Sequence, residues 1–239
     1  HSKSAIFINK EDKFLRNYKK EGIKKIYFGK GSDFSYGEHK IINFTKMSVD
    51  LIVKGEKINV EFPYINLGMP ILLSIATAVG NYLNVNIQDI KSGIASIKLP
   101  KLRMEILEIL GKKVILDAYN ANPVSVKYAL KTLMELEGKR KSVILGDIKE
   151  LGKYSKYYHT LLAKYVAKLP LKDIVLVGEE MIFAHRYLKN KKIKHFYYKD
   201  VLSAKSKFEK FLKDTDIILI KGSRAVQLEK ILGEKIDVI

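Results

Sequence analysis

The sequence contains no cysteine and no tryptophan, and no uninterrupted apolar run approaches the ~18 residues typical of a membrane-spanning helix. Without cysteine, the chain can form neither a disulfide framework nor a thiolate metal site or nucleophile. The opening residues 1–9 lack the long apolar core and the small-residue cleavage site of a signal peptide. We therefore expect a cytoplasmic protein that is not inserted in a membrane.

Acidic residues are few compared with basic ones: 44 Lys and Arg face 26 Asp and Glu, giving a formal net charge of +18. Such an excess suits anionic partners, including nucleic acid, acidic lipid and phosphorylated substrates. The lysines are spread along the chain, however, apart from short runs such as Lys189–Lys192. This favours a diffusely basic surface and no nucleic-acid partner, with a non-catalytic nucleotide- or nucleic-acid-binding α/β protein as the alternative.

The two parts of the chain, residues 1–100 and 101–239, have different patterns. In the first part Lys54-Gly55-Glu56 indicates a hairpin turn, and Pro70 suits the first turn of a helix. The expected elements are strands at 5–9 and 25–28 separated by a polar, helix-like run, a β-rich stretch at 41–62, and helices at 70–83 and 86–97. A linker is expected near Ser96–Leu102, where Pro100 interrupts the second helix.

The second part alternates between apolar runs and helical patterns. Several of the apolar runs are continuous, which is typical of strands covered on both faces. The expected strands are 113–116, 142–145, 174–177, 195–198 and 216–220, and the expected helices are about 123–137, 155–168, 179–189, 200–212 and 224–232. Five strands alternating with helices predict a parallel, doubly wound α/β sheet.

The densest group of polar residues is LDAYNANP, at residues 116–123. An apolar strand ends there in an acid, and ligands of parallel α/β sheets bind at the carboxyl ends of strands. Asp117 could accept hydrogen bonds from ribose hydroxyls, and Asn120 and Asn122 each offer one acceptor and two donors. On the residues alone, it is equally possible that Asp117 and Asn122 cap the following helix.

Two further motifs also follow expected strands. In VILGDIKELG, Asp147 lies where a substrate amine or a metal could be met, although a helix cap is the favoured interpretation of the residues alone. In IKGSRA, Lys221 is a cation, Gly222 permits close approach, and Ser223 is a candidate helix cap. The first N–H groups of that helix could bind a carboxylate or phosphate, and an ordinary capped turn is equally possible.

Other candidate residues carry weaker signals. Arg103, at the junction of the two parts, could reach a phosphate, but with Glu105 it is more simply a surface charge pair. His159 and His185 are interpreted as structural histidines. GKGSDF at residues 29–34 has the wrong spacing for a phosphate-binding loop. We find no catalytic triad, and we expect no metal ligand in this chain.

Together, DAYNANP, LGDIKELG with His159 downstream, and KGSRAVQLEKIL resemble the C-terminal domain of the Mur ligase family, over the whole of 101–239. Residues 1–100 resemble more loosely the latter part of the family's central ATP-binding domain, through FINKED and the helix at 70–83. The resemblance implies an α/β fold: a partial central domain followed by a Rossmann-like, doubly wound C-terminal domain.

The resemblance also implies a chemistry. Family members use ATP and Mg²⁺ to phosphorylate the carboxyl end of a UDP-linked peptide, and an amine then attacks the acyl phosphate. The motifs are most similar to those of the member that joins D-alanyl-D-alanine to UDP-N-acetylmuramoyl-tripeptide for peptidoglycan synthesis. Closure of the C-terminal domain over the central domain completes the site.

Site residues follow from the resemblance position by position. Asp117 is similar to the ribose-binding acid, and Arg103 to the catalytic arginine that approaches the ATP phosphates. Tyr119, Asn120 and Asn122 are expected near the nucleotide. The residues expected on the dipeptide side are Asp147, Lys221 and Ser223.

The chain also departs from the family pattern. The family's phosphate loop and Mg²⁺ ligands are not found in it, so we expect the chain alone to be inactive. Met69, Pro70 and Leu72 occupy the neighbourhood of a family His-Asn pair, which puts adenine contacts there in doubt.

Overall fold

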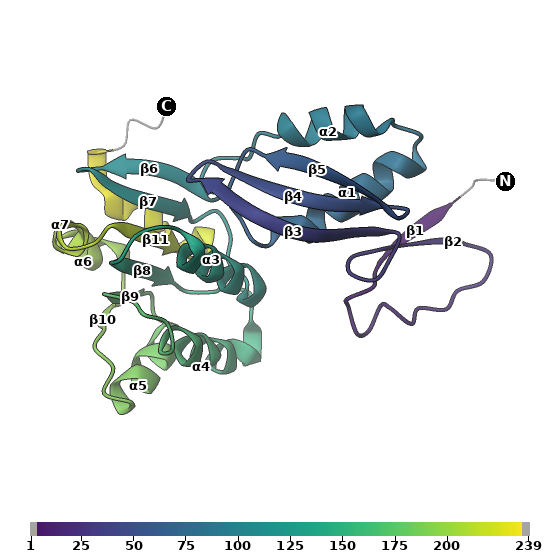
Figure 1. The fold of residues 1–239 in the computed structure, drawn as a ribbon. Helices are drawn as coiled ribbons and strands as arrows, with labels where there is room; N and C mark the ends of the chain where they lie inside the picture. The colour runs from purple at the N-terminus through teal and green to yellow at the C-terminus, as the bar shows by residue number, and fades with distance from the viewer. Residues whose placement is uncertain (1–3, 236–239) are drawn as a thin grey trace. The chain divides into compact units, whose positions relative to one another are not determined.

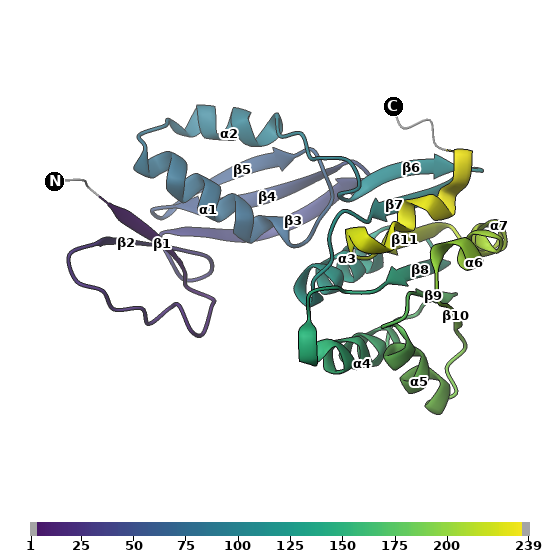
Figure 2. The same cartoon turned by 180° about the vertical axis from the view of Figure 1, so that it is seen from behind.

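The computed structural model describes residues 4–235 and divides the chain into two compact units, His1–Lys98 and Leu99–Ile239. Figure 1 shows the fold, and Figure 2 shows it from behind. The boundary between the units lies two residues before the one expected from the sequence. Among residues 4–235, no helix combines the length and the apolar character needed to cross a membrane.

The first unit is a five-stranded sheet in the order β1-β2-β3-β4-β5. Strands β1 to β3 are parallel, whereas β3, β4 and β5 form an antiparallel meander. The strands are β1 (Ala5–Asn9), β2 (Lys24–Phe28), β3 (Phe34–Asn43), β4 (Lys46–Val53) and β5 (Glu56–Phe62). The hairpin expected at Lys54–Glu56 is confirmed: Val53 pairs with Glu56, and Lys54 and Gly55 have positive φ angles of 51° and 92°.

Two helices pack against this sheet, α1 (Met69–Tyr82) and α2 (Ile87–Ala95). Pro70 lies in the first turn of α1, and the side chain of Asn86 caps α2 by accepting a hydrogen bond from the Asp89 N–H. The core beneath the helices contains Phe28, Phe34, Val53 and Ala78.

The helix-like run between β1 and β2 is a prediction that proves wrong. The Asp12 side chain accepts hydrogen bonds from the N–H groups of Phe14 and Leu15, which fixes a turn instead. Phe14 and Leu15 are 79% and 49% exposed. A helix here would therefore lack a buried apolar face to stabilise it.

The second unit is a six-stranded sheet in the order β10-β9-β8-β11-β7-β6. The strands are β6 (Glu105–Ile109), β7 (Lys112–Asp117), β8 (Lys141–Gly146), β9 (Ile174–Val177), β10 (Phe196–Tyr198) and β11 (Ile217–Lys221). Five of them are parallel, which confirms the doubly wound arrangement. The sixth, β6, was not expected. It forms an antiparallel hairpin with β7 through Leu110 and Gly111, whose φ angles of 51° and 70° suit a tight hairpin turn.

Helices cover both faces of this sheet (Figures 1 and 2). The helices α3 (Pro123–Glu135), α4 (Ser155–Val166) and α5 (Ile182–Asn190) lie on one face. The other face carries α6 (Val201–Lys205), α7 (Phe208–Lys213) and the 3₁₀ segment η3 (Leu228–Lys235). Successive residues of β11 point to opposite faces of the sheet, and all five are buried.

The last two helical predictions require correction. The helix expected at 200–212 is two short helices, α6 and α7. The helix expected at 224–232 is two 3₁₀ segments, η2 (Arg224–Val226) and η3. Gln227 lies between these segments with a left-handed φ of 55°, a conformation that ends an α-helix.

Candidate functional site

Three of the sequence motifs meet at the carboxyl edge of the second sheet. Strand β11 lies between β7 and β8, and the register places Lys221 beside both Asp117 and Leu145. The loops that follow these three neighbouring strands therefore lie at the same edge of the sheet, and they carry LDAYNANP, LGDIKELG and KGSRA. This edge is where ligands of open parallel α/β sheets bind.

Asp117 and Lys221 form a partly buried ion pair at this edge. The Lys221 Nζ donates to Asp117 Oδ2 at 2.6 Å and to the backbone oxygen of Asn120 at 3.1 Å. The Lys221 side chain is only 2% exposed, and that of Asp117 is 13% exposed. Within residues 4–235, Asp117 Oδ1 has no hydrogen-bond partner, so it is available to accept from a ligand. Asp117 does not cap α3, so the interpretation of Asp117 as a helix cap is wrong.

Asn122 is the residue that caps α3. Its side chain accepts from the Ser125 N–H at 2.8 Å, and the Ser125 Oγ accepts from the Asn122 N–H at 3.1 Å, a reciprocal capping box. The Asn120 side chain accepts from the Ala121 N–H at 2.7 Å. Both asparagines thus shape the loop between Asp117 and α3.

Arg103 lies in a tight turn between two residues with positive φ angles, Leu102 at 65° and Met104 at 49°. Both angles lie in the left-handed region, which residues other than glycine rarely adopt. The Arg103 guanidinium carbon lies 4.2 Å from the centre of the Tyr119 ring, a cation–π contact. The Tyr119 N–H also donates to the Leu102 oxygen at 3.1 Å, which holds the turn against the loop after β7.

Glu105 stabilises the same turn. Its Oε2 accepts a hydrogen bond from the Leu102 N–H at 3.0 Å. Within the described part of the chain, no ion pair joins Glu105 to Arg103, so the charge-pair interpretation of these two residues is wrong.

Asp147 is almost completely buried and is the centre of a second polar network. Its Oδ1 accepts from the Met181 N–H at 2.9 Å, and its Oδ2 lies 2.8 Å from the Lys149 Nζ. Lys149 reaches Glu180 at 3.0 Å, and Glu180 also accepts from the Ser155 hydroxyl. The loops after β8 and β9 are thereby joined.

The charges of this network are mutually stabilised. Burial alone would raise the pKa of Glu180, but hydrogen bonds from Ser155 and Lys149 outweigh burial and hold that pKa below its ordinary value. Burial would likewise lower the pKa of Lys149, but Asp147 and Glu180 raise it. Lys149 therefore stays protonated and Glu180 stays ionised near neutral pH.

His159 supports the loop that carries Asp147. Its Nε2 accepts from the Ile148 N–H at 3.1 Å, so the proton of the neutral ring lies on Nδ1, which is 2.9 Å from the Ser155 backbone oxygen. The ring is fully buried. These contacts confirm the interpretation of His159 as a structural histidine.

Ser223 joins the loops after β8 and β11. Its N–H donates to the Asp147 oxygen at 3.0 Å, and its Oγ accepts from the Lys149 N–H at 2.9 Å. The expectation that Ser223 caps an anion-binding helix is wrong, because η2 is one 3₁₀ turn and the Ser223 side chain makes no cap hydrogen bond.

Glycine at position 222 is required by close packing rather than by its backbone angles. A Cβ there would lie 2.8 Å from Leu228 Cδ1 and 3.0 Å from the Gly146 Cα. The ends of β8 and β11 approach this closely because neither Gly146 nor Gly222 has a side chain.

Sequence reasoning missed three residues of this edge: Lys149, Ser155 and Glu180. Lys149 and Ser155 lie in or beside the LGDIKELG motif, but Glu180 follows a different strand, and nothing in its local pattern marks it. Across the described residues, no group of three or more His, Cys, Asp or Glu side chains is placed to hold a metal ion.

Comparison with known proteins identifies the class to which this fold and edge belong. The sequence model of the family described as Mur ligase, glutamate ligase domain, matches residues 102–224, more than half of the chain. The chain belongs to the Mur ligase family.

The curated relatives are similar to this chain over most of its length, and they share one name within the family. The chain is 30% identical over 226 residues to the UDP-N-acetylmuramoyl-tripeptide–D-alanyl-D-alanine ligase of Rickettsia prowazekii, covering 92% of this chain and 49% of that protein. It is 29% identical to the ligase of the same name from Buchnera aphidicola, covering 98% and 52%. The chain thus spans about half the length of the curated relatives it matches.

Solved structures support the fold. The crystal structure of MurF from Acinetobacter baumannii matches with a TM-score of 0.87 at 24% identity, over 98% of this chain and 52% of that chain. MurF ligase from Thermotoga maritima in complex with ADP matches with a TM-score of 0.80 at 24% identity, over 97% and 53%. These likenesses confirm the expected α/β fold with its Rossmann-like second unit.

Proposed function

We propose that the chain is part of an ATP-dependent ligase that joins D-alanyl-D-alanine to UDP-N-acetylmuramoyl-tripeptide in peptidoglycan precursor synthesis, in the cytoplasm. The observation that carries the proposal is the carboxyl edge of the second sheet, where Asp117, Lys221 and the Arg103–Tyr119 pair lie on adjoining segments. The names of the curated relatives supply the reaction. Residues 1–100 would be the latter part of the central ATP-binding domain, and 101–239 the C-terminal domain.

The nucleotide would bind through Asp117 and Arg103. Asp117 Oδ1 can accept hydrogen bonds from ribose hydroxyls while Oδ2 remains on Lys221, whose buried ammonium keeps the carboxylate oriented. The Arg103 guanidinium, stacked on Tyr119, presents its remaining N–H groups to phosphate oxygens. Asn120 and Asn122 set the shape of the loop beside the nucleotide.

The second group, Asp147, Lys221 and Ser223, would form the dipeptide side of the cleft. Asp147 has both carboxylate oxygens engaged within the protein, and Ser223 receives the Lys149 N–H. We therefore assign Asp147 and Ser223 the role of positioning the loops after β8 and β11, rather than of contacting the dipeptide amine.

The proposed reaction has two steps. The carboxylate of the tripeptide attacks the γ-phosphorus of ATP, which releases ADP and forms an acyl phosphate. The D-alanyl-D-alanine amine then attacks the acyl carbon, and phosphate leaves as the amide forms and the amine loses a proton. Arg103 would stabilise negative charge on the transferred phosphoryl group. Mg²⁺ would neutralise phosphate charge, and among residues 4–235 no group of His, Cys, Asp or Glu side chains is placed to hold it.

Nucleotide binding can be tested on the chain itself by isothermal titration with ADP. We expect Asp117→Asn to weaken binding by about tenfold, since a hydrogen bond to a charged group contributes about 1.5 kcal/mol. The matched control is Asp200→Asn, at the cap of α6 on the opposite face, which should leave the affinity unchanged. Equal affinities of wild type and Asp117→Asn would contradict the ribose assignment.

The ligase reaction can be tested by reconstitution. The chain is mixed with a separately expressed segment covering the portion of the Rickettsia prowazekii relative that it does not match. We expect the chain alone to be inactive, the mixture to release ADP in the presence of both substrates, and Asp117→Ala or Arg103→Ala to abolish that release. Activity of the chain alone would refute its dependence on the second segment.

The reconstitution also separates the ligase from the alternative. If the two segments co-elute but release no ADP above background, the ligase proposal fails. A salt-dependent affinity for RNA or DNA with no preference for ATP would then identify a basic nucleic-acid-binding protein.

A further inference from the structure

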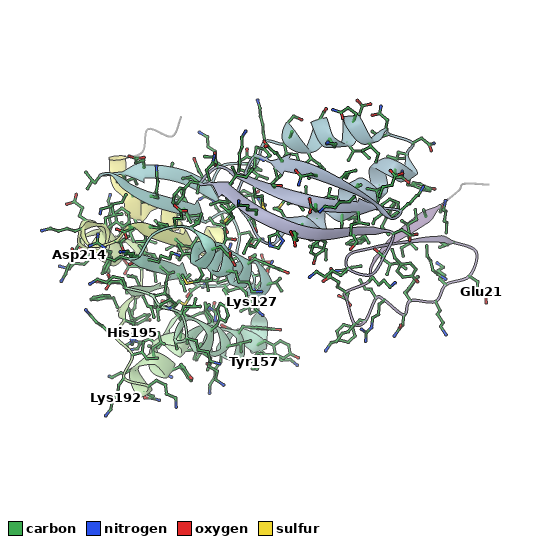
Figure 3. The ribbon with its side chains drawn as sticks, viewed as in Figure 1. Glu21, Lys127, Tyr157, Lys192, His195 and Asp214 are labelled. Carbon is green, nitrogen blue, oxygen red and sulfur yellow. The ribbon has the colours of Figure 1, made fainter. Side chains whose placement is uncertain are left out.

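A hollow of about 310 Å³ lies between α3 and α4, outside the site described above. Val126 of α3 lines one wall, and Leu161, Leu162 and Tyr165 of α4 line the other, with Ile148 among the buried residues that reach it. Figure 3 labels Lys127 and Tyr157, which lie on these two neighbouring helices. All of its lining residues belong to the second unit.

The α4 wall of the hollow is formed by the apolar stripe of this helix. Tyr158, Leu161, Leu162 and Tyr165 follow the i, i+3, i+4, i+7 spacing of one helix face. Leu162 is buried, but Leu161 is 45% exposed. Leu161 thus extends the buried stripe to the opening of the hollow, where a ligand could cover it.

The charges around the hollow have one sign. Lys127, Lys164 and Lys168 line it, and no acidic residue does. All three lysines are exposed, so their ammonium groups can remain hydrated beside an apolar interior. Such a site is complementary to a ligand with an apolar body and an anionic end.

We propose that this hollow binds a small amphipathic carboxylate, with an acyl or aryl group against Leu161, Leu162 and Val126 and the carboxylate beside the lysines. The volume matches the lower end of the range for small-molecule sites, about 300–1,000 Å³.

The hollow adjoins the site without being part of it. Ile148 lines it and follows Asp147 directly, and the Ile148 N–H is held by His159. Pro123 lines it and follows Asn122, the cap of α3. A bound ligand therefore contacts residues adjacent to two predicted site residues. The binding proposal does not depend on the ligase function.

Octanoate and 1-octanol, which differ in charge but hardly in size, are suitable probes. Each is titrated into the chain with ¹³C-labelled methyl groups, and NMR shifts are followed. We expect octanoate to shift the methyl signals of Val126, Ile148, Leu161 and Leu162. We expect it to bind about two- to fivefold more tightly than octanol, as an ion pair with an exposed lysine would produce.

Two variants test the apolar wall and the charges separately. Leu161→Asp should abolish octanoate binding, whereas Leu202→Asp, at an exposed leucine of α6, should not. The double variant Lys127→Gln/Lys164→Gln should remove the preference for octanoate over octanol, whereas Lys207→Gln should retain it. Because Leu161 and these lysines are exposed, the variants should fold normally, which the unperturbed methyl spectrum verifies.

Three outcomes would overturn the proposal. The first is no shift at these methyl groups at millimolar octanoate. The second is binding that survives Leu161→Asp. The third is equal affinity of the wild-type chain for octanoate and octanol, which would refute the assignment of a carboxylate.

Discussion

The two sheets of the molecule bury their strands differently. In the second unit all five residues of β11 are buried, and β8 is buried from its second residue onward. In the first unit β4 alternates strictly: Met47, Val49, Leu51 and Val53 are buried beneath the helices, and the residues between them are partly exposed. The difference follows from coverage, since helices lie on both faces of the second sheet, whereas α1 and α2 pack on the face formed by these buried residues.

This difference determines where polar side chains can lie. On the partly exposed face of β4 and β5, Asn59 donates to Asp50 and Ser48, and Lys57 pairs with Asp50 at 2.6 Å. These contacts run across the middle of the strands. In the second unit the central residues of β8, β9 and β11 are apolar and buried, so ion pairs lie at the ends of the strands. Arg140 and Asp216 pair at the amino edge, and the candidate site with Asp117 and Lys221 lies at the carboxyl edge.

The largest expected effect compares glycines in the two units. A Cβ at Gly178, whose φ is +123°, would lie 2.3 Å from Asp147 Oδ1, whereas a Cβ at Gly55, with φ +92°, would meet no atom within 4 Å. We expect Gly178→Ala to destabilise the second unit by about 4 kcal/mol, from backbone strain and overpacking together. Gly55→Ala should cost the first unit about 1 kcal/mol from strain alone.

Hydrogen exchange followed by mass spectrometry resolves the two units and is the appropriate measurement, because two units need not unfold together. If Gly178→Ala and Gly55→Ala lower protection equally, the network around Asp147 is not as tightly packed as its contacts imply.

The second prediction compares two ion-paired aspartates. Asp147→Ala removes the partner of Lys149 and the acceptor for the Met181 N–H, and we expect a loss of about 2–3 kcal/mol, since breaking a buried pair costs about 3–5 kcal/mol and Lys149 is partly exposed. Asp50→Ala should cost less than about 1 kcal/mol, because Lys57 is mostly exposed. Asp147→Asn, which can still accept from Met181, should be milder than Asp147→Ala. The loss of stability is measured by hydrogen exchange in each unit. A larger loss for Asp50→Ala than for Asp147→Ala would contradict this account.

The periodicity of apolar residues predicted most of the helices and strands, because burial in the fold determines where apolar residues recur. The continuous apolar runs that became β8, β9 and β11 are visible without a structure, as is the hairpin at Gly55. The segment between β1 and β2 was predicted to be helical because an acid followed by polar residues, as at Asp12, is also typical of the start of a helix. In the structure Asp12 caps a turn instead. Strand β6 was missed although Leu110-Gly111 offered a turn signal, because its charged residues, Glu105 and Glu108, obscured the alternation.

The sequence predicted several residues of the candidate site, but not the hydrogen bonds and ion pairs that join them. Asp117, Asp147 and Lys221 each end or follow an apolar strand, a position that suits ligand binding. On the residues alone, however, a helix cap was equally possible for Asp117 and was favoured for Asp147. Their partners were not predictable, because pairing depends on strand order. Lys221 reaches Asp117 only because β11, the last strand, inserts beside β7. Glu180 joins Asp147 only because β9 lies next to β8.

A smaller effect is expected at the Arg103–Tyr119 contact. Tyr119→Leu removes the ring beneath the guanidinium, and an exposed cation–π contact contributes about 0.5–1 kcal/mol. We expect ADP affinity to fall by about two- to fivefold. Tyr119→Phe keeps a ring and should restore most of the affinity, and Tyr154→Leu, at another exposed tyrosine that contacts a lysine, should have no effect. Equal losses for Tyr119→Leu and Tyr119→Phe would show that the hydroxyl, not the ring, is needed.

The smallest expected effect is a pH dependence confined to the second unit. His195 Nδ1 donates to the Ile193 oxygen at 2.7 Å, and its Nε2 lies at hydrogen-bond distance, 2.8 Å, from His185 Nδ1. Burial lowers the pKa of His185, and the charges of His195, Lys189 and Arg186 lower it further.

Because the folded pKa of His185 is depressed, the unfolded chain binds this proton more readily. Stability should therefore be constant above the ordinary histidine pKa of 6.5 and should decrease as the pH falls below it, until the folded pKa is reached. His185→Gln retains a donor to His195 and should flatten the slope between pH 7.5 and 5.5, measured by exchange protection of β9 and β10. His39→Gln, at an exposed position of β3, is the matched control. An unchanged slope in His185→Gln would assign the pH dependence to other groups of the second unit.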